Sequence, residues 1–166
     1  MEMKLEVVVI PVSDVDRAKQ FYTRMGWSLD IDYSSDEDYR IVQFTPPGSG
    51  CSIIFGKGIT TAEPGSVQGL HLIVSDLVAV RDRLIADGIG VGELFHDEGG
   101  VFHHIDADKL ARGPNPERKS YASYASFNDP DGNRWVFQEV TARLSADLQG
   151  GDTRFTKPLV DWLTAT

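Results

Sequence analysis

The chain contains the same local pattern twice, and this repeat restricts the possible folds more than any other feature. Residues 7–27 read VVVIPVSDVDRAKQFYTRMGW, and residues 69–89 read GLHLIVSDLVAVRDRLIADGI. Each copy has an apolar run, a Val-Ser-Asp turn, an amphipathic run and a glycine. Asp14 and Asp76 lie 62 positions apart (76 − 14), as do Gly26 and Gly88 (88 − 26). The repeat indicates two structural copies within one small protein.

Each copy predicts a strand, a helix and three further strands. Ser13 or Asp14 is suited to cap the first helix, and Gly26 stands where a glycine commonly ends one. The strands expected in the first copy are residues 5–12, 27–32, 39–45 and 52–56. In the second copy the helix is expected at 76–87, and the strands at 69–74, 91–96, 120–127 and 134–140. KPLVDWLT near the C-terminus is a further helical candidate.

One copy alone would leave the apolar face of a four-stranded sheet exposed, whereas two copies can bury that face or enclose a cavity. We therefore expect an α+β fold in which two βαβββ modules form a cupped eight-stranded mixed sheet with the helices outside. Residues 1–141 are predicted to form one domain from modules 4–58 and 67–141. A polar loop at 97–119 is inserted in the second module, and residues 142–166 form a C-terminal extension.

The charge and composition exclude several functional classes. The formal net charge is −9, which argues against non-specific binding of nucleic acid. A single cysteine, Cys51, rules out an internal disulfide and fits a reducing compartment. The apolar stretches are too short to span a membrane, and the N-terminus does not have the pattern of a signal peptide. A cytoplasmic protein is expected.

Three segments, PVSDVDRAKQFYTRMGW, HLIVSDL and FNDPDGNRWVFQEV, together with the paired element order, resemble the vicinal oxygen chelate superfamily. This group includes glyoxalases, bleomycin-resistance proteins and extradiol dioxygenases. The resemblance covers about residues 4–141 and implies one glyoxalase-like domain, but it is specific for the fold and not for a reaction. Because members commonly pair their chains, it also implies a homodimer.

Enzymes of this superfamily usually hold a divalent metal with one ligand from each of four strands. The resemblance places these four positions at Val7, Ile54, Gly69 and Val136. None of these residues has a side chain that binds a divalent ion. The resemblance therefore implies that the usual metal has been lost, and we expect no cofactor.

Alternation of side chains along strands predicts which residues share the face of the family's cavity. If Gly69 faces the cavity, His71 and Ile73 do so as well. The predicted apolar floor consists of Val7, Val9, Ile54, Ile73 and Val136. His71 is then a lone polar group on this floor. It is either a core histidine bonded to a carbonyl or a tyrosine, or a ligand contact or general base.

Other candidates depend on which face a strand presents. Arg40 and Gln43 are separated by an odd number of residues, so only one of them faces the cavity, and the same holds for Tyr121 and Tyr124. Arg40 and Tyr121 are taken as ligand-binding candidates. The alternatives are that Arg40 pairs with an acidic residue of SSDEDY and that the inward tyrosine is a wall residue. Glu139 has the wrong register for the family's last metal ligand, so we expect it to be structural or on the surface, with an arginine as a candidate partner.

The inserted loop gathers three of the four histidines, His96, His103 and His104. Imidazole and carboxylate groups together suit zinc, iron or manganese. A relocated metal site would draw its carboxylates from Asp97, Glu98 or Asp106. The alternative is a hydrated polar loop, or a lid over the cavity in which His103 gates the ligand or acts as a catalytic base.

The leading functional hypothesis is a glyoxalase-like protein that binds a small organic molecule in an apolar cavity without a metal. It either sequesters the molecule or, as a lyase or isomerase, moves a proton with His71 or His103. The second hypothesis is a metal-dependent lyase, isomerase or oxygenase with its site on loop 96–106. The third is a regulatory or dimerisation module. The predicted partners are a small molecule and a second copy of the chain, not nucleic acid or a membrane.

Overall fold

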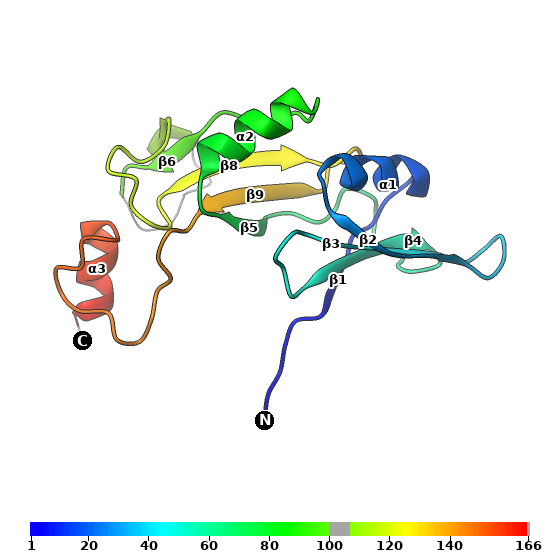
Figure 1. The fold of residues 1–166 in the computed structure, drawn as a ribbon, viewed down its shortest axis with the longest axis horizontal. Helices are drawn as coiled ribbons and strands as arrows, with labels where there is room; N and C mark the ends of the chain where they lie inside the picture. Colours follow the sequence, from blue (N-terminus) through cyan, green and yellow to red (C-terminus); the bar gives the residue numbers. More distant parts are fainter. Residues whose placement is uncertain (100–106, 166) are drawn as a thin grey trace. The chain divides into compact units, whose positions relative to one another are not determined.

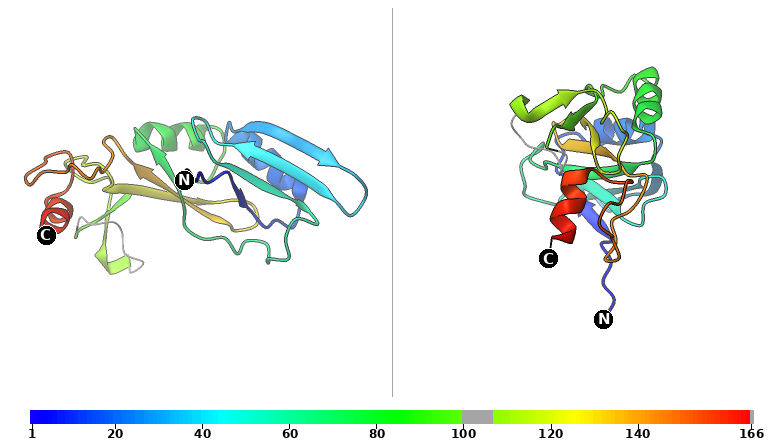
Figure 2. Two further views of the ribbon diagram at one scale, coloured as in Figure 1. Left: turned by 90° about the horizontal axis from the view of Figure 1, so that it is seen from below. Right: turned by 90° about the vertical axis from the view of Figure 1, so that its left-hand side faces the viewer.

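The computed structural model describes residues 1–99 and 107–165 of the chain (Figures 1 and 2). It divides into two compact units, described separately below. The first contains Met1–Leu70 and Asn128–Trp135, and the second contains His71–Phe127 and Val136–Thr166. The α+β class and the paired element order are confirmed. Where one eight-stranded sheet was expected, the described strands form two mixed sheets, of four and five strands.

The first unit has the predicted order of one strand, one helix and three strands. The four strands are ordered β1-β4-β3-β2, with β1 parallel to β4 and the other neighbours antiparallel. Its elements are β1 (Val7–Val9), α1 (Val15–Arg24), β2 (Ser28–Ser34), β3 (Arg40–Thr45) and β4 (Ser52–Lys57). The first strand is shorter than the expected 5–12.

Helix α1 covers one face of this sheet (Figure 1). Its N-cap is Asp14, whose carboxylate accepts a hydrogen bond from the Arg17 amide at 3.0 Å. The buried ring of Tyr22 packs on Phe44 and Phe55, with ring centroids 6.1 Å and 5.6 Å away. The Tyr22 hydroxyl donates to the Asp129 carboxylate at 3.0 Å, and burial raises the pKa of this phenol strongly. The turn at 128–135 is thereby fastened to the first unit.

The second sheet is ordered β5-β9-β8-β6-β7. The predicted strand at 91–96 is wrong in extent: β6 begins at Phe95, and Val91 forms only an isolated bridge with Phe127. A short strand, β7, lies inside the segment expected to be a loop. The elements are β5 (Leu70–Val74), α2 (Leu77–Ala86), β6 (Phe95–Asp97), the 3-10 turn η1 (Ala107–Lys109), β7 (Leu110–Arg112), β8 (Ser123–Asn128) and β9 (Arg134–Glu139).

The expected helix in the tail is confirmed as α3 (Lys157–Thr164). Phe155, Leu159 and Val160 form a small buried cluster, and Tyr121 and Leu144 pack against it. Trp162, on the same helix, is 68% exposed. Among the described residues, no helix is long and apolar enough to cross a membrane.

Candidate functional site

The first sheet has one packed face and one uncovered face. On the α1 side, Val42, Phe44, Ile53 and Phe55 are buried. The alternate residues of the same strands point away from α1, because successive side chains of a strand lie on opposite faces. We call this second surface the open face. It is formed by Val7, Val9, Ile31, Tyr33, Ile41, Gln43, Thr45, Ser52 and Ile54.

The strand register arranges the open face in rows that run across the sheet. Val9 lies beside Ile54, Ile54 beside Gln43, and Gln43 beside Ile31. Val9 and Ile31 are 37% and 41% exposed, although both are aliphatic. The predicted grouping of Val7, Val9 and Ile54 on one face is thus observed within this unit. The row forms an apolar surface that the first unit itself does not cover.

A neighbouring row of the open face is polar. Val7 lies beside Ser52, and the Ser52 hydroxyl is 2.7 Å from that of Thr45. The Thr45 hydroxyl in turn donates to the carboxylate of Asp30. Sequence reasoning did not identify Asp30, Thr45 or Ser52. A pattern of alternating residues carries no sign of the register shift that the structure shows between Leu29 and Ile31.

In the second sheet, the two predicted residues of β5 are solvent-exposed. His71 is exposed and Ile73 is 49% exposed, whereas the residues that alternate with them, Leu70, Leu72 and Val74, are half-buried. Val136 on β9 is 2% exposed, so it is packed inside the second unit. His71 and Ile73 therefore offer contact surface, and Val136 supports the sheet.

Gly69 has a backbone role that strand alternation did not reveal. Its φ is +76°, a conformation that favours glycine. The Gly69 amide donates to the Arg134 carbonyl, and the Arg134 amide donates to the Val67 carbonyl. At the other end of the strands, the Val140 amide donates to the Val74 carbonyl. Between these two equivalent hydrogen bonds the chain advances seven residues on the β5 side (67 to 74) and six on the β9 side (134 to 140), so β5 contains one extra residue. The β5 side therefore contains a β-bulge between residues 67 and 74.

A family model described as the Glyoxalase/Bleomycin resistance protein/Dioxygenase superfamily matches residues 4–137, more than half of the chain. The chain belongs to this superfamily. The resemblance inferred from the three sequence segments is thereby confirmed. Comparison with curated proteins found no match.

Solved structures of similar proteins agree with this membership. The chain is 27% identical to TnmS3, an antibiotic binding protein from Streptomyces sp. CB03234, covering 84% of this chain and 97% of that one, with a TM-score of 0.61. A glyoxalase/bleomycin resistance protein from the same Streptomyces is 28% identical, with coverage of 82% and 100% and a TM-score of 0.59. A superfamily member from Sphaerobacter thermophilus DSM 20745, at 24% identity, coverage of 83% and 98% and a TM-score of 0.58, supports the fold alone.

The residues at the superfamily's usual metal positions do not fit a metal ion. Val7 has Ser52 beside it, and Ile54 lies between Val9 and Gln43, so no imidazole or carboxylate replaces the missing ligands there. In the part of the chain that the structure describes, no group of three or more His, Cys, Asp or Glu side chains is placed to hold a metal. We therefore derive no chemistry through a metal at these positions.

The relocated site predicted on the inserted loop is only partly within the described structure. His103, His104 and Asp106 lie outside the described residues. His96 contacts the Gly113 carbonyl through Nδ1 at 2.9 Å. Asp97 is 4% exposed and accepts a hydrogen bond from the Gly99 amide at 2.7 Å. These contacts hold the ends of the loop, and the metal hypothesis stays a prediction.

Arg40 lies on the α1 side of the sheet, and Gln43 is the member of this pair that reaches the open face. The Arg40 guanidinium forms two 2.9 Å hydrogen bonds to Asp32 and one of 2.8 Å to Asp16. The alternative in which Arg40 pairs with an acidic residue is therefore observed, although neither partner belongs to SSDEDY. Hydrogen bonds from Arg40, followed by those from Lys19, hold the pKa of Asp32 well below its ordinary value.

Tyr124, not Tyr121, is the tyrosine that lies on strand β8. It is 1% exposed, its hydroxyl donates to the Tyr121 carbonyl at 2.6 Å, and it accepts a hydrogen bond from Gln138 at 3.1 Å. Burial raises the pKa of Tyr124 to about 12. Tyr121 precedes the strand with a φ of +67°, and its ring lies 6.3 Å from that of Phe155 in the tail. The structure thus places Tyr121 against the C-terminal extension.

Glu139 has the predicted structural role. It is 1% exposed and accepts two hydrogen bonds from the Arg118 guanidinium. The same carboxylate accepts a hydrogen bond from the Leu77 amide at 2.9 Å, at the start of α2. Glu139 therefore fixes the N-terminus of this helix, where a negative charge is stabilising.

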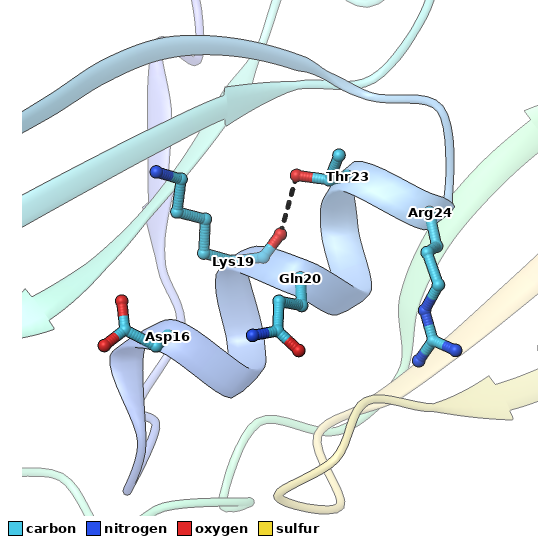
Figure 3. Close-up of a pocket in the computed structure, with 5 residues that line it drawn as sticks. All are labelled: Asp16, Lys19, Gln20, Thr23 and Arg24. Atoms are coloured by element: carbon cyan, nitrogen blue, oxygen red, sulfur yellow. Dashed lines mark hydrogen bonds between the residues drawn. The ribbon is translucent and has the colours of Figure 1, made fainter.

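One surface pocket lies along α1 (Figure 3), and Arg40 is the predicted residue that contacts its lining, through Asp16. Its volume is about 730 Å³, and it is lined by Asp16, Lys19, Gln20, Thr23 and Arg24. The Thr23 hydroxyl donates to the Lys19 carbonyl within the helix at 2.8 Å, so it serves the backbone. The lining consists of helical surface residues of mixed charge, which gives this pocket little chemical selectivity.

Proposed function

We propose that the protein binds a small organic molecule with a flat apolar body on the open face of its first sheet. The observation that carries this proposal is the exposure of Val7, Val9, Ile31 and Tyr33 on one side of a sheet whose other side buries Val42, Phe44, Ile53 and Phe55. Scattered apolar residues are normal on protein surfaces, but adjoining ones on one sheet face mark a contact surface.

The comparison with solved structures supports binding as the activity. TnmS3 is an antibiotic binding protein, and it shares 27% of its residues with this chain over almost its whole length. The open face provides aliphatic and aromatic contacts, one amide and three hydroxyls, and the Asp30 carboxylate is bonded to it, which is the composition of a recognition surface. Binding without chemical conversion, that is sequestration, follows most directly from these groups.

The experiment uses 9-anthracenemethanol, a neutral three-ring fluorophore, as the probe. Its dissociation constant is measured by fluorescence titration for the wild type, Ile31→Thr and Ile85→Thr. Threonine keeps the β-branched shape that strands favour and removes apolar area. Ile31 and Ile85 are 41% and 44% exposed, but Ile85 lies on α2, so it is a matched control.

Ile31→Thr is expected to weaken binding about fivefold, which corresponds to roughly 1 kcal/mol of lost apolar contact. Ile85→Thr is expected to bind like the wild type. Absence of probe binding by the wild type, or equal effects of the two substitutions, would contradict the proposal. Native mass spectrometry of untagged protein would in addition reveal a co-purified molecule and its mass.

A further inference from the structure

A β-bulge turns one carboxylate onto the open face. Leu29 pairs with Phe44 and Ile31 with Gln43, so Asp30 is an additional residue on β2 opposite this pair. Its carboxylate accepts hydrogen bonds from the Thr45 hydroxyl and, at 3.4 Å, from the Gln43 side-chain amide. Both partners belong to the open face. Bulges are a recurrent way for a sheet to redirect one side chain.

The chemistry of the groups around Asp30 determines which of them donates each hydrogen bond. An ionised carboxylate only accepts, so the Thr45 hydroxyl must donate its single proton to Asp30. The 2.7 Å contact between Thr45 and Ser52 is then donated by Ser52. Ser52, Thr45 and Asp30 thus form a chain of hydrogen bonds that ends on the carboxylate. It fixes the orientation of Asp30 and leaves acceptor positions for one more donor.

Asp30 lacks the cations that its neighbour has. Asp32, two residues along β2, is paired with Lys19 at 2.7 Å and with Arg40 at 2.9 Å. Among residues 1–99 and 107–165, no Lys, Arg or His pairs with Asp30, whose partners are a neutral hydroxyl and a neutral amide. The carboxylate is exposed, so a ligand can reach it.

The carboxylate also borders a hollow that can hold part of a ligand. Asp30 and Thr45 line a pocket of about 430 Å³ together with Trp27, Ser28 and the turn at 46–49. The Asp30 carboxylate lies between two rows of the open face, because it accepts hydrogen bonds from Thr45 of the polar row and from Gln43, which stands between Ile54 and Ile31 in the apolar row.

We infer that Asp30 selects the ligand class: an apolar, ring-containing molecule with a protonated amine beside its apolar body. The ammonium group would donate to the Asp30 carboxylate while the rings cover the apolar row. A charge-assisted hydrogen bond of this kind adds both affinity and orientation. The inference rests on the proposed function, since the same open face binds the apolar body.

The test compares two probes that differ in one group. Both carry the anthracene ring system: 9-(aminomethyl)anthracene is a cation at pH 7, and 9-anthracenemethanol is neutral. Dissociation constants of both are measured at low salt for the wild type, Asp30→Asn and Asp147→Asn. Asparagine keeps the acceptor for Thr45. Asp147 is exposed in the C-terminal extension, so its replacement changes the net charge equally and serves as the control.

The wild type is expected to bind the cationic probe about fivefold more tightly than the neutral one, as befits a solvent-accessible ion pair. Asp30→Asn should abolish this preference and leave the neutral probe unaffected, and Asp147→Asn should preserve it. Equal affinities in the wild type, or a preference that survives Asp30→Asn, would overturn the inference while the proposed function stands. Failure of both probes to bind would overturn the two together.

Discussion

Replacing Arg40 by methionine separates a structural role from ligand recognition. The Arg40 side chain donates two hydrogen bonds of 2.9 Å to Asp32 and one of 2.8 Å to Asp16. The side chains of Arg40 and Asp32 are only 22% and 23% exposed, whereas that of Asp16 is 73% exposed. The bidentate pair with Asp32 should therefore dominate, and the contact with Asp16 should add little.

Arg40→Met is expected to lower the unfolding free energy by about 1.5 kcal/mol at pH 7. This loss is larger than that of a fully exposed ion pair and smaller than that of a buried ion pair. For a protein of this size, that corresponds to a decrease in melting temperature of roughly 3–6 °C. Asp32 keeps its 2.7 Å contact with Lys19, which prevents a larger loss. Methionine retains a long apolar stem, so the packing of the side chain changes little.

The cost should depend on pH in a defined direction. The hydrogen bonds from Arg40 lower the pKa of Asp32 in the folded protein. A carboxyl with a lowered pKa stabilises the fold above its unfolded value, near 3.9, and loses that contribution as the pH falls through its folded value. The difference between wild type and Arg40→Met should therefore be complete at pH 7 and shrink below about pH 4.

The assay is urea unfolding between pH 2 and 7, combined with titration of 9-anthracenemethanol at pH 7. The control is Arg24→Met, which also removes one positive charge. Arg24 lies on α1 and lines the surface pocket there. Arg40→Met should bind the probe with unchanged affinity, because Arg40 lies on the face opposite to the open face. Weakened probe binding with an unchanged unfolding free energy would refute this assignment and return Arg40 to the ligand site.

Three further predictions concern the scaffold. Arg118→Ala should cost about 2 kcal/mol in urea unfolding, because Glu139 stays buried without its cation; a loss below about 0.5 kcal/mol would contradict this. The raised pKa of Tyr124, about 12, implies stability that is complete below pH 10 and lost as the pH rises toward 12. Tyr124→Phe should therefore reduce this alkaline loss, and an unchanged pH profile would argue against it. Gly65→Ala should lower the melting temperature by several degrees, since its Cβ would lie 2.2 Å from the Asp131 carbonyl.

The repeat made much of the fold predictable because its signals are local. Asp14 and Asp76 both cap helices, each accepting a 3.0 Å hydrogen bond from the amide three residues later. Gly26 and Gly88 have φ values of +77° and +78°, as expected for glycines that end helices. Capping and helix termination depend on a few neighbouring residues, so the sequence alone was sufficient for them.

The candidate site was less predictable because it depends on register. Strand alternation correctly grouped Val7, Val9 and Ile54, which lie on β1 and β4. It left open whether Arg40 or Gln43 faces the same side. Residues three positions apart on a strand lie on opposite faces, so alternation places one of the two there without saying which. Asp30 was missed because a bulge without glycine has no sequence signature, and only its pairing with Gln43 and Thr45 reveals it.

The two copies of the repeat have come to present different surfaces, although their sequence pattern is the same. In the first sheet the face opposite α1 remains accessible, and its apolar row continues into the hydrogen-bonded row that ends at Asp30. In the second sheet Val136, Gln138 and Tyr124 are all buried; Gln138 donates to the Tyr124 hydroxyl, and both side chains donate to the Tyr121 carbonyl. A side chain whose donors are already engaged has little left to offer a ligand. In the proposed mode of binding, selectivity therefore comes from the first copy, where the carboxylate of Asp30 still has acceptor capacity.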